Sequence, residues 1–169
     1  MRGESFMQLH RNVLFIFLPP VALVLIAAGL TPKPGLYEVT NRMTWQHSPF
    51  PDSMQEKPGS GAPHTAQTCV TQSQIDKYNG PKPTADGGCQ VTNIQKRSAG
   101  MTAVMTCTGS MTGKGTIETI WTDSGHSKSK VHFTGEMKVG PNSKSVEWTI
   151  DSQSSFKGPD CGSVKPSDQ

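Results

Sequence analysis

The sequence predicts an all-β, mainly antiparallel fold, an up-and-down meander of about seven strands that forms a barrel or a strongly curved sheet. Three observations predict this class. Apolar residues recur at every second position over several short segments, as they do in strands with one buried face. Turn-forming residues separate these segments at roughly ten- to twelve-residue spacing. The chain is also rich in Ser, Thr, Gly and Pro, with 17 Gly and 13 Pro among its 169 residues, which suits strands and turns better than helices.

The N-terminal segment, residues 1–30, is predicted to be a signal helix. Two arginines precede an apolar run over 13–30, and small residues close this run at 27–29. The order of basic, apolar and small residues is typical of a secretory signal peptide. The run is also long enough for an uncleaved membrane anchor. The pair Pro19-Pro20 is a poor feature for the middle of a membrane span, which favours cleavage.

The first predicted strand runs from Tyr37 to Trp45. Its apolar residues alternate with Glu, Thr and Arg, and Asn41 is the one polar residue on the apolar side. A long loop rich in Pro, Gly and Ser follows over 46–67. Loops of this length are functional or mobile, and the low apolar content of this one favours a mobile segment.

A short strand at 68–70 and a brief helix come next. Thr71 or Ser73 provides the N-cap, and the helix ends at Tyr78, before a turn signal at 79–81. A second loop then leads the chain into a hairpin.

The hairpin is predicted around the polar turn at 97–100, with two β-prone arms placed symmetrically about Ser98. Folding it brings three pairs opposite one another: Cys89 and Cys107, Val91 and Met105, and Ile94 and Thr102. This arrangement predicts a cross-strand disulfide on the core side of the sheet. A β-bulge at Gly100 would shift the register by one residue and separate the cysteines.

The last part of the domain is predicted to contain three further strands. The glycines over 109–115 indicate a turn region whose register the pattern leaves open, and turns at 123–125 and 140–142 join the strands. We expect one disulfide-stapled β domain over 33–162 and a polar tail over 163–169. The three strands are predicted at 116–122, 130–139 and 145–151.

All four cysteines lie after the N-terminal segment. An even number of cysteines in a small exported domain is typical of disulfides. The hairpin symmetry favours Cys89–Cys107, which leaves Cys69–Cys161 as the second pair. A zinc site would need close cysteine pairs such as C-x-x-C, and the chain has none.

Several short motifs occur in an order that is similar to a known family. The motif KPGLYEVT at 33–40 follows the leader, Cys-Val-Thr at 69–71 precedes the helix, and Met-Thr-Gly-x-Gly at 111–115 precedes the late Cys161. This order resembles domain-of-unknown-function family 3617, small exported bacterial envelope proteins, over nearly the whole mature chain. Tyr37 stands where the family pattern usually carries Trp. The resemblance implies an envelope location and a β-rich domain, and it carries no established catalytic residues.

Metal binding and catalysis find little support in the sequence. The 5 histidines form no His-x-His or His-x-x-x-His pair. Methionine together with histidine in an exported protein is a pattern of copper binding. Several of these methionines, however, share strand faces with Val, Trp and Phe, as packing residues do. No Gly-x-Ser-x-Gly elbow and no nucleophile–base pairing occurs, so we expect no metal, no cofactor and no enzymatic activity.

The predicted function is that of an exported envelope protein that binds, without catalysis, an apolar small molecule or an envelope partner. Its basis is a Met-rich apolar strand face and a loop long enough to cover it. A structural or stress-related envelope protein without a small ligand is the alternative, and an enzyme with a loop-assembled site is a third hypothesis. The candidate ligand-facing or core residues are Tyr37, Val39, Met43, Trp45, Val91, Met101, Met105, Val131, Phe133, Met137, Val146 and Trp148.

The expected location follows from the predicted signal segment, and the expected partners follow from the net charge. Export implies a periplasmic or secreted protein, or a membrane-anchored one if the signal is retained, with translation starting at Met1 or Met7. The net charge of +3 is mild and the basic residues are scattered, so no nucleic-acid partner is expected. Membrane contact is expected only through the N-terminal segment, and the oligomeric state stays open. A sealed core under the 71–78 helix would exclude a ligand carrier, whereas an open apolar cavity would favour one.

Overall fold

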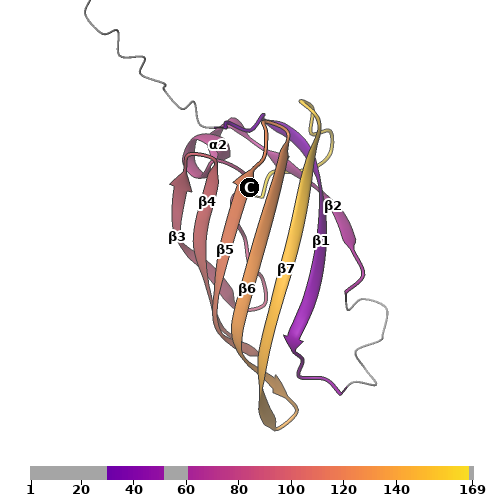
Figure 1. The fold of residues 1–169 in the computed structure, drawn as a ribbon, viewed down its shortest axis with the longest axis vertical. Helices are drawn as coiled ribbons and strands as arrows, with labels where there is room; N and C mark the ends of the chain where they lie inside the picture. The colour runs from indigo at the N-terminus through magenta and orange to yellow at the C-terminus, as the bar shows by residue number, and fades with distance from the viewer. Residues whose placement is uncertain (1–29, 52–60, 168–169) are drawn as a thin grey trace, which may run out of the picture.

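The computed structural model describes residues 30–51 and 61–167 of the chain. A 7-stranded antiparallel sheet and a short helix make up this part (Figure 1). The prediction of an all-β, antiparallel fold with one short helix is confirmed. The elements in chain order are β1 Gly35–His47, β2 His64–Val70, α2 Gln72–Tyr78, β3 Cys89–Arg97, β4 Gly100–Thr108, β5 Met111–Trp121, β6 His126–Val139 and β7 Asn142–Gly158.

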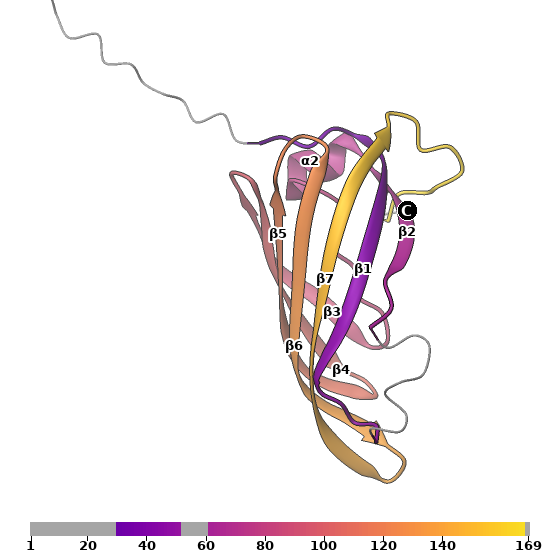
Figure 2. The ribbon, with the colours of Figure 1, turned by 45° about the vertical axis from the view of Figure 1, so that its right-hand side comes forward.

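The sheet is open and strongly curved. Its strand order is β2-β1-β7-β6-β5-β4-β3, so β2 and β3 are the two edge strands. Strands β3 to β7 form a meander, and β1 pairs with β7 at the end of it. Figure 2 shows the sheet bending around a concave side, with α2 at one end of that side. Of the two predicted forms, a barrel or a strongly curved sheet, the described residues adopt the second.

Most strands are longer than the sequence predicts. β7 continues to Gly158, where the alternation predicts an end near Asp151. β5 begins at Met111, so the turn prediction for 109–115 is wrong from that residue on. The glycines serve close packing instead, since a Cβ added at either Gly113 or Gly135 would lie 2.9 Å from Cζ of Phe133. The fully buried Phe133 ring therefore occupies the space that these glycines leave on the concave face.

The β3–β4 hairpin places Cys89 opposite Cys107 and Val91 opposite Met105, as the sequence predicts. The prediction that Ile94 lies opposite Thr102 is wrong, because Gln95 is the partner of Thr102. Arg97 pairs with Gly100, so the turn contains two residues and is one residue tighter than the symmetric prediction. Between Thr92 and Gln95, β3 contains one residue more than the facing part of β4, which compensates for the tighter turn.

The bulge that restores the hairpin register lies at Asn93 rather than at Gly100. Asn93 has a φ of 51°, in the left-handed region that Asn enters more readily than most residues. The extra residue on β3 compensates for the tight turn, and beyond it the cysteines come into direct opposition.

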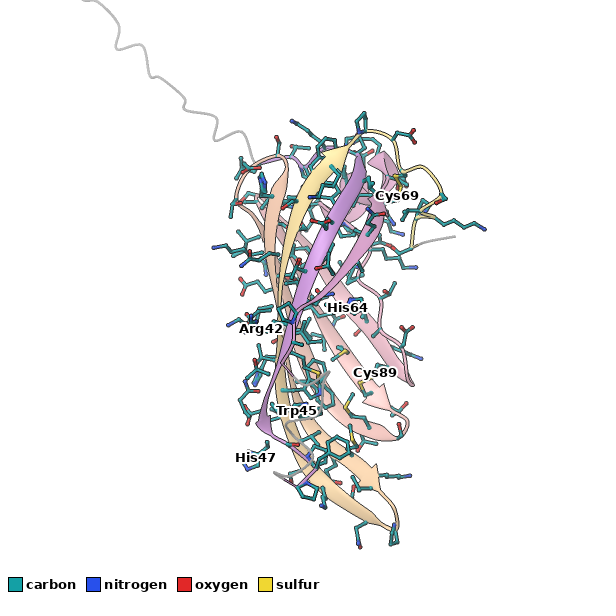
Figure 3. The ribbon with its side chains drawn as sticks, turned by 90° about the vertical axis from the view of Figure 1, so that its right-hand side faces the viewer. Arg42, Trp45, His47, His64, Cys69 and Cys89 are labelled. Atoms are coloured by element: carbon teal, nitrogen blue, oxygen red, sulfur yellow. A yellow bond between two sulfur atoms is a disulfide. The ribbon has the colours of Figure 1, made fainter. Side chains whose placement is uncertain are left out.

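Two disulfides, Cys69–Cys161 and Cys89–Cys107, join the pairs that the sequence favours. Figure 3 shows the disulfide at Cys69 near the α2 end of the sheet and the one at Cys89 further along the concave side. Cys107 is buried and Cys89 packs against the same apolar cluster, so this disulfide lies in the core. Because disulfides persist in oxidising surroundings, the two bonds indicate an oxidising compartment.

The helix α2 is capped at both ends. The Thr71 hydroxyl accepts a hydrogen bond from the Gln74 backbone N–H at 3.2 Å, and the Gln74 side chain accepts one from the Thr71 N–H at 3.1 Å. This capping box makes Thr71, rather than Ser73, the N-cap. The C-cap is Asn79, in the left-handed region with a φ of 58°. The side chain of Gln74 also donates to the Ser167 hydroxyl at 3.2 Å, so the polar tail after 162 returns to the helix.

The predicted signal segment lies almost entirely outside the described residues, which begin at Leu30. Within the described ranges, no helix has both the length and the apolar character needed to cross a bilayer. The long loop predicted at 46–67 is shortened at both ends by β1 and β2, and residues 52–60 within it are also outside the description.

The core of the described domain is divided into two apolar clusters on the concave side. The small cluster at the α2 end consists of Tyr37, Val70, Ile75 and Trp121. The large cluster, further along the strands, consists of Ala103, Met105, Cys107, Ile117, Phe133, Val146 and Trp148.

Candidate functional site

Small hydroxyl side chains cross the concave face between the two apolar clusters. The strand register places Ser127 on β6 opposite Ser154 on β7, and Ser129 opposite Ser152. On β5, Thr119 is the partner of Ser129. We call these five residues the hydroxyl belt. They occupy inward positions at which a half-buried strand normally carries larger apolar residues.

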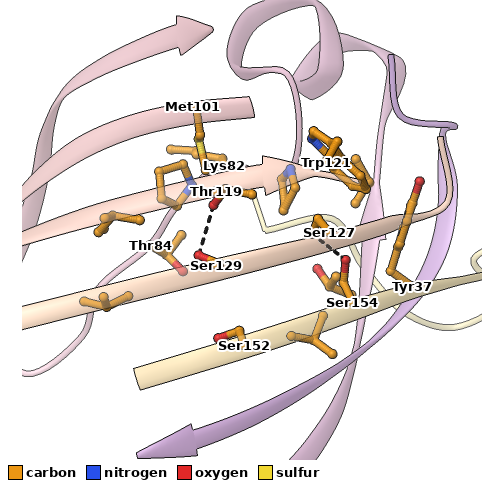
Figure 4. A pocket seen from close by; sticks show the side chains of 17 residues that line it. Tyr37, Lys82, Thr84, Met101, Thr119, Trp121, Ser127, Ser129, Ser152 and Ser154 are labelled. Carbon is orange, nitrogen blue, oxygen red and sulfur yellow. Dashed lines mark hydrogen bonds between the residues drawn. The ribbon is translucent and has the colours of Figure 1, made fainter. Parts of the chain in front are cut away.

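Four members of the hydroxyl belt are hydrogen-bonded in pairs. The hydroxyl oxygens of Ser127 and Ser154 are 2.6 Å apart, and Thr119 donates a hydrogen bond to Ser129 at 3.0 Å (Figure 4). The fifth, Ser152, makes no side-chain hydrogen bond within the described part of the chain. Its hydroxyl is therefore open to another partner.

A cavity of about 200 Å³ lies over the hydroxyl belt, and all five belt residues line it (Figure 4). Both apolar clusters contribute to its walls. The belt side chains are small, so they leave space that larger residues at the same inward positions would fill. The main apolar wall residues are Tyr37, Val39, Val70, Ile117, Trp121 and Val131.

The segment after α2 lies across the cavity from the sheet and contributes Pro81, Lys82, Pro83 and Thr84 to the lining. Its first anchor is Asn79. The indole Nε1 of Trp121 donates to the Asn79 carbonyl at 2.6 Å, and the Asn79 side chain donates to the carbonyl of Arg97 at 3.2 Å.

The second anchor of this segment is the start of the hairpin. The N–H of Thr108 donates to the Gly88 carbonyl at 3.1 Å, and the disulfide of Cys89 follows directly. Between the anchors, residues 81–85 make no backbone hydrogen bond to the rest of the described chain. We call these residues the strap. It covers the cavity through side-chain packing alone, and two of its residues are prolines that lack an N–H.

Among the described residues, the lining of the cavity contains no carboxylate and no histidine. Its two ionisable residues are Lys82, on the strap, and Tyr37, on the wall. The Tyr37 hydroxyl donates to the Lys33 carbonyl at 2.7 Å. Burial raises the pKa of Tyr37 to about 12, so its phenol is neutral over the physiological range. The floor and walls are therefore uncharged.

A family model described as "Protein of unknown function (DUF3617)" matches residues 32–161. The chain belongs to the DUF3617 family. The matched segment contains the seven described strands, both disulfides and the cavity. No curated protein and no solved structure matches the chain. Because the DUF3617 description attaches no activity to the family, the functional argument rests on the geometry of the site.

The candidate residues from the sequence fall into two groups in this DUF3617 structure. Tyr37, Val39, Met101 and Val131 line the cavity. The other eight belong to the large cluster or pack against it, away from the cavity. Those eight are Met43, Trp45, Val91, Met105, Phe133, Met137, Val146 and Trp148.

The hydroxyl belt of the DUF3617 domain is the part that sequence reasoning missed. The alternation of large apolar residues ends at Lys130 on β6 and at Asp151 on β7, which is where the predicted strands end. Ser127 and Ser129 precede the first boundary, and Ser152 and Ser154 follow the second. The available signal was serine at every second position beyond the apolar part of each strand. The alternation of inward and outward residues continues there, although the inward residues are no longer apolar.

Ionisable side chains of this DUF3617 domain pair on the surface rather than in the cavity. Nε2 of His132 is 3.0 Å from a Glu147 carboxylate oxygen, and Nδ1 of His126 is 2.9 Å from Asp123. Among the described residues, no group of three or more His, Cys, Asp or Glu is arranged to hold a metal.

Proposed function

We propose that this DUF3617 protein binds a small, mainly apolar molecule in the cavity between the hydroxyl belt and the strap, without catalysis. The cavity of about 200 Å³ is the observation that carries the proposal. The cavity is partly open to solvent, and its lining is mainly apolar with a few polar groups, as in most small-molecule sites. A space of this size, left open by five small side chains between two apolar clusters, is consistent with a ligand site.

The volume of the cavity limits the size of the ligand. A dry cavity of about 150 Å³ accepts benzene, whereas pockets for drug-sized molecules measure about 300–1,000 Å³. The expected occupant is therefore a molecule of one ring or a short branched chain, or one such group of a larger molecule. The apolar walls of Val39, Ile117 and Trp121 favour burial of a hydrocarbon surface.

Access to the cavity is expected at the strap. Residues 81–85 can separate from the sheet without breaking a backbone hydrogen bond, because they make none to the rest of the described chain. The anchors at Asn79 and Gly88 hold both ends of the strap during such a movement.

The absence of catalysis is part of the proposal. Serine hydroxyls are weak nucleophiles unless a base lies within hydrogen-bond distance. Four of the five belt hydroxyls are paired with one another, and the described lining contains no His, Asp or Glu. This arrangement suits recognition of a ligand better than chemistry on it.

Export is the second part of the proposal. The two disulfides require oxidising surroundings, and the N-terminal residues have the order of a secretory signal peptide. We propose that the protein acts in the periplasm or outside the cell. Mass spectrometry of exported protein should find a new N-terminus between Gly29 and Thr31, and an intact leader on membrane-bound protein would contradict cleavage.

A pair of neighbouring substitutions on β7 tests ligand binding. Ser152→Leu places a large side chain in the cavity, and Gln153→Leu introduces the same side chain at an exposed position of the same strand. Toluene is the probe, with its affinity measured by isothermal titration calorimetry. We expect the unmodified protein and Gln153→Leu to bind toluene equally, and Ser152→Leu to bind roughly tenfold more weakly or not at all.

Native mass spectrometry of protein purified from its own host provides the second readout. A co-purified small molecule that Ser152→Leu loses and Gln153→Leu retains would support the proposal. Equal toluene affinity in both variants would contradict the site. No binding of toluene and no co-purified molecule would favour the alternative, a structural envelope protein without a small ligand.

A further inference from the structure

We infer that the ligand carries one uncharged hydroxyl group, which is hydrogen-bonded by Ser152 at the floor of the cavity. This inference rests on the proposed function and specifies the class of molecule: a compact phenol or alcohol rather than a pure hydrocarbon or a carboxylate. It is carried by the pairing pattern within the hydroxyl belt.

The belt leaves one hydroxyl without a partner, at the β7 end of the row formed by Thr119, Ser129 and Ser152. Ser127 and Ser154 satisfy each other, and Thr119 donates to Ser129. Ser152 lies in the cavity lining and is half-buried, and its hydroxyl makes no hydrogen bond to the described residues. A hydroxyl in the lining without a protein partner is available to a polar group of a ligand.

Ser152 and its cross-strand neighbour offer both donors and acceptors. Ser129, its partner on β6, accepts from Thr119 and so keeps its own proton for a further bond. A ligand hydroxyl, which donates and accepts at once, matches this set of groups.

Charge argues against an acid at the same place. No cationic side chain belongs to the belt, and the one lysine among the described lining residues, Lys82, belongs to the strap. A carboxylate removed from water without a cation beside it is strongly disfavoured. A neutral hydroxyl needs only the hydrogen bonds that Ser152 and Ser129 offer.

Three probes of similar ring size separate these classes: p-cresol, toluene and benzoate. The first adds a hydroxyl to the second, and the third replaces the methyl group of toluene with a carboxylate. Their affinities are measured by calorimetry on the unmodified protein, on Ser152→Ala and on Ser145→Ala, an exposed serine of the same strand. Unfolding midpoints of the variants confirm that each is folded.

We expect Ser152→Ala to weaken p-cresol binding roughly three- to tenfold, which corresponds to the loss of one hydrogen bond. Toluene binding should stay within about twofold in this variant, because toluene makes no hydrogen bond to lose. Ser145→Ala should leave both affinities unchanged, and Ser152→Thr, which retains a hydroxyl, should restore p-cresol binding. Benzoate should bind most weakly of the three.

Two results would overturn the inference while leaving the proposed function intact. One is an equal effect of Ser152→Ala on p-cresol and toluene, and the other is benzoate as the tightest ligand. Failure of all three probes to bind, with no change on substitution, would instead reject the cavity as a binding site and with it both proposals.

Discussion

Ser127 on β6 and Ser154 on β7 lie directly opposite each other, and their hydroxyl oxygens are 2.6 Å apart. Ser127 is buried on the concave side of the sheet. Two serines that satisfy each other can occupy the core without an unpaired polar group. They also fill little space, which is why a cavity lies beside them.

A double-mutant cycle on this pair should give a coupling free energy of about 0.5–1.5 kcal/mol. Ser127→Ala and Ser154→Ala each leave one hydroxyl without its partner. Each substitution should therefore reduce the free energy of unfolding more in the unmodified protein than in the variant that already lacks the other serine. The measurement is the free energy of unfolding in urea. Thr40 and Thr65 form an exposed hydroxyl pair at 3.1 Å, and their cycle is the control, with coupling near zero. Strictly additive effects at the serine pair would contradict the prediction.

Trp121→Phe should destabilise the domain by about 1–3 kcal/mol more than Trp148→Phe does. Both tryptophans are buried, and both substitutions remove similar volume. The Nε1 of Trp121 donates to the Asn79 carbonyl at 2.6 Å, whereas the Nε1 of Trp148 has no partner among the described residues. Chemical denaturation of both variants measures the difference, and equal losses would show that the Asn79 anchor contributes little.

Gly135→Ala should destabilise the domain by about 3 kcal/mol. The added Cβ would meet the backbone oxygen of Thr112 and the Phe133 ring, neither of which can move without disturbing β5 or the core. Gly158→Ala is the matched control, because a Cβ at that position meets nothing within 4 Å. Thermal unfolding of the two variants tests this, and an equal midpoint for both would contradict the packing role of Gly135.

The stability of the domain should fall at alkaline pH because of Tyr37. Burial raises the pKa of this phenol from 10.0 to about 12, so the folded state holds the proton more tightly than the unfolded chain. The contribution is fully present below pH 10 and is lost as the pH rises toward 12. Unfolding free energies measured across this range should show a smaller decline for Tyr37→Phe. An identical decline in the variant would assign the effect to other groups.

The hairpin shows how a sequence prediction can be right for an incomplete reason. The symmetric spacing of Cys89 and Cys107 predicts their opposition, which the structure contains. The opposition depends, however, on a two-residue turn and a compensating bulge at Asn93. Local spacing gives the number of residues between the cysteines, but it does not show how those residues are divided between the turn and the bulge.

The cavity was less accessible to prediction than the strands. Tyr37, Val39, Met101 and Val131 were recognisable as inward apolar residues, but the same pattern also selected eight residues that fill the large cluster. Period two tells which face of a strand is buried. It does not tell which part of that face is tightly packed, because packing depends on the side chains that other strands and loops contribute to the same region.

The sequence by itself determined the strand class, the short helix after residue 70 and the cysteine pairs, because these depend on neighbouring residues and on simple counting. The choice of Thr71 over Ser73 as the N-cap came from the structure. Only the tertiary structure decided that serines from β6 and β7 meet Thr119 of β5 under a strap of residues 81–85. Each serine alone is an ordinary polar residue near a strand end. Strand register and sheet curvature bring the five side chains of the hydroxyl belt together. Because all five are small, they leave the space that we propose for the ligand.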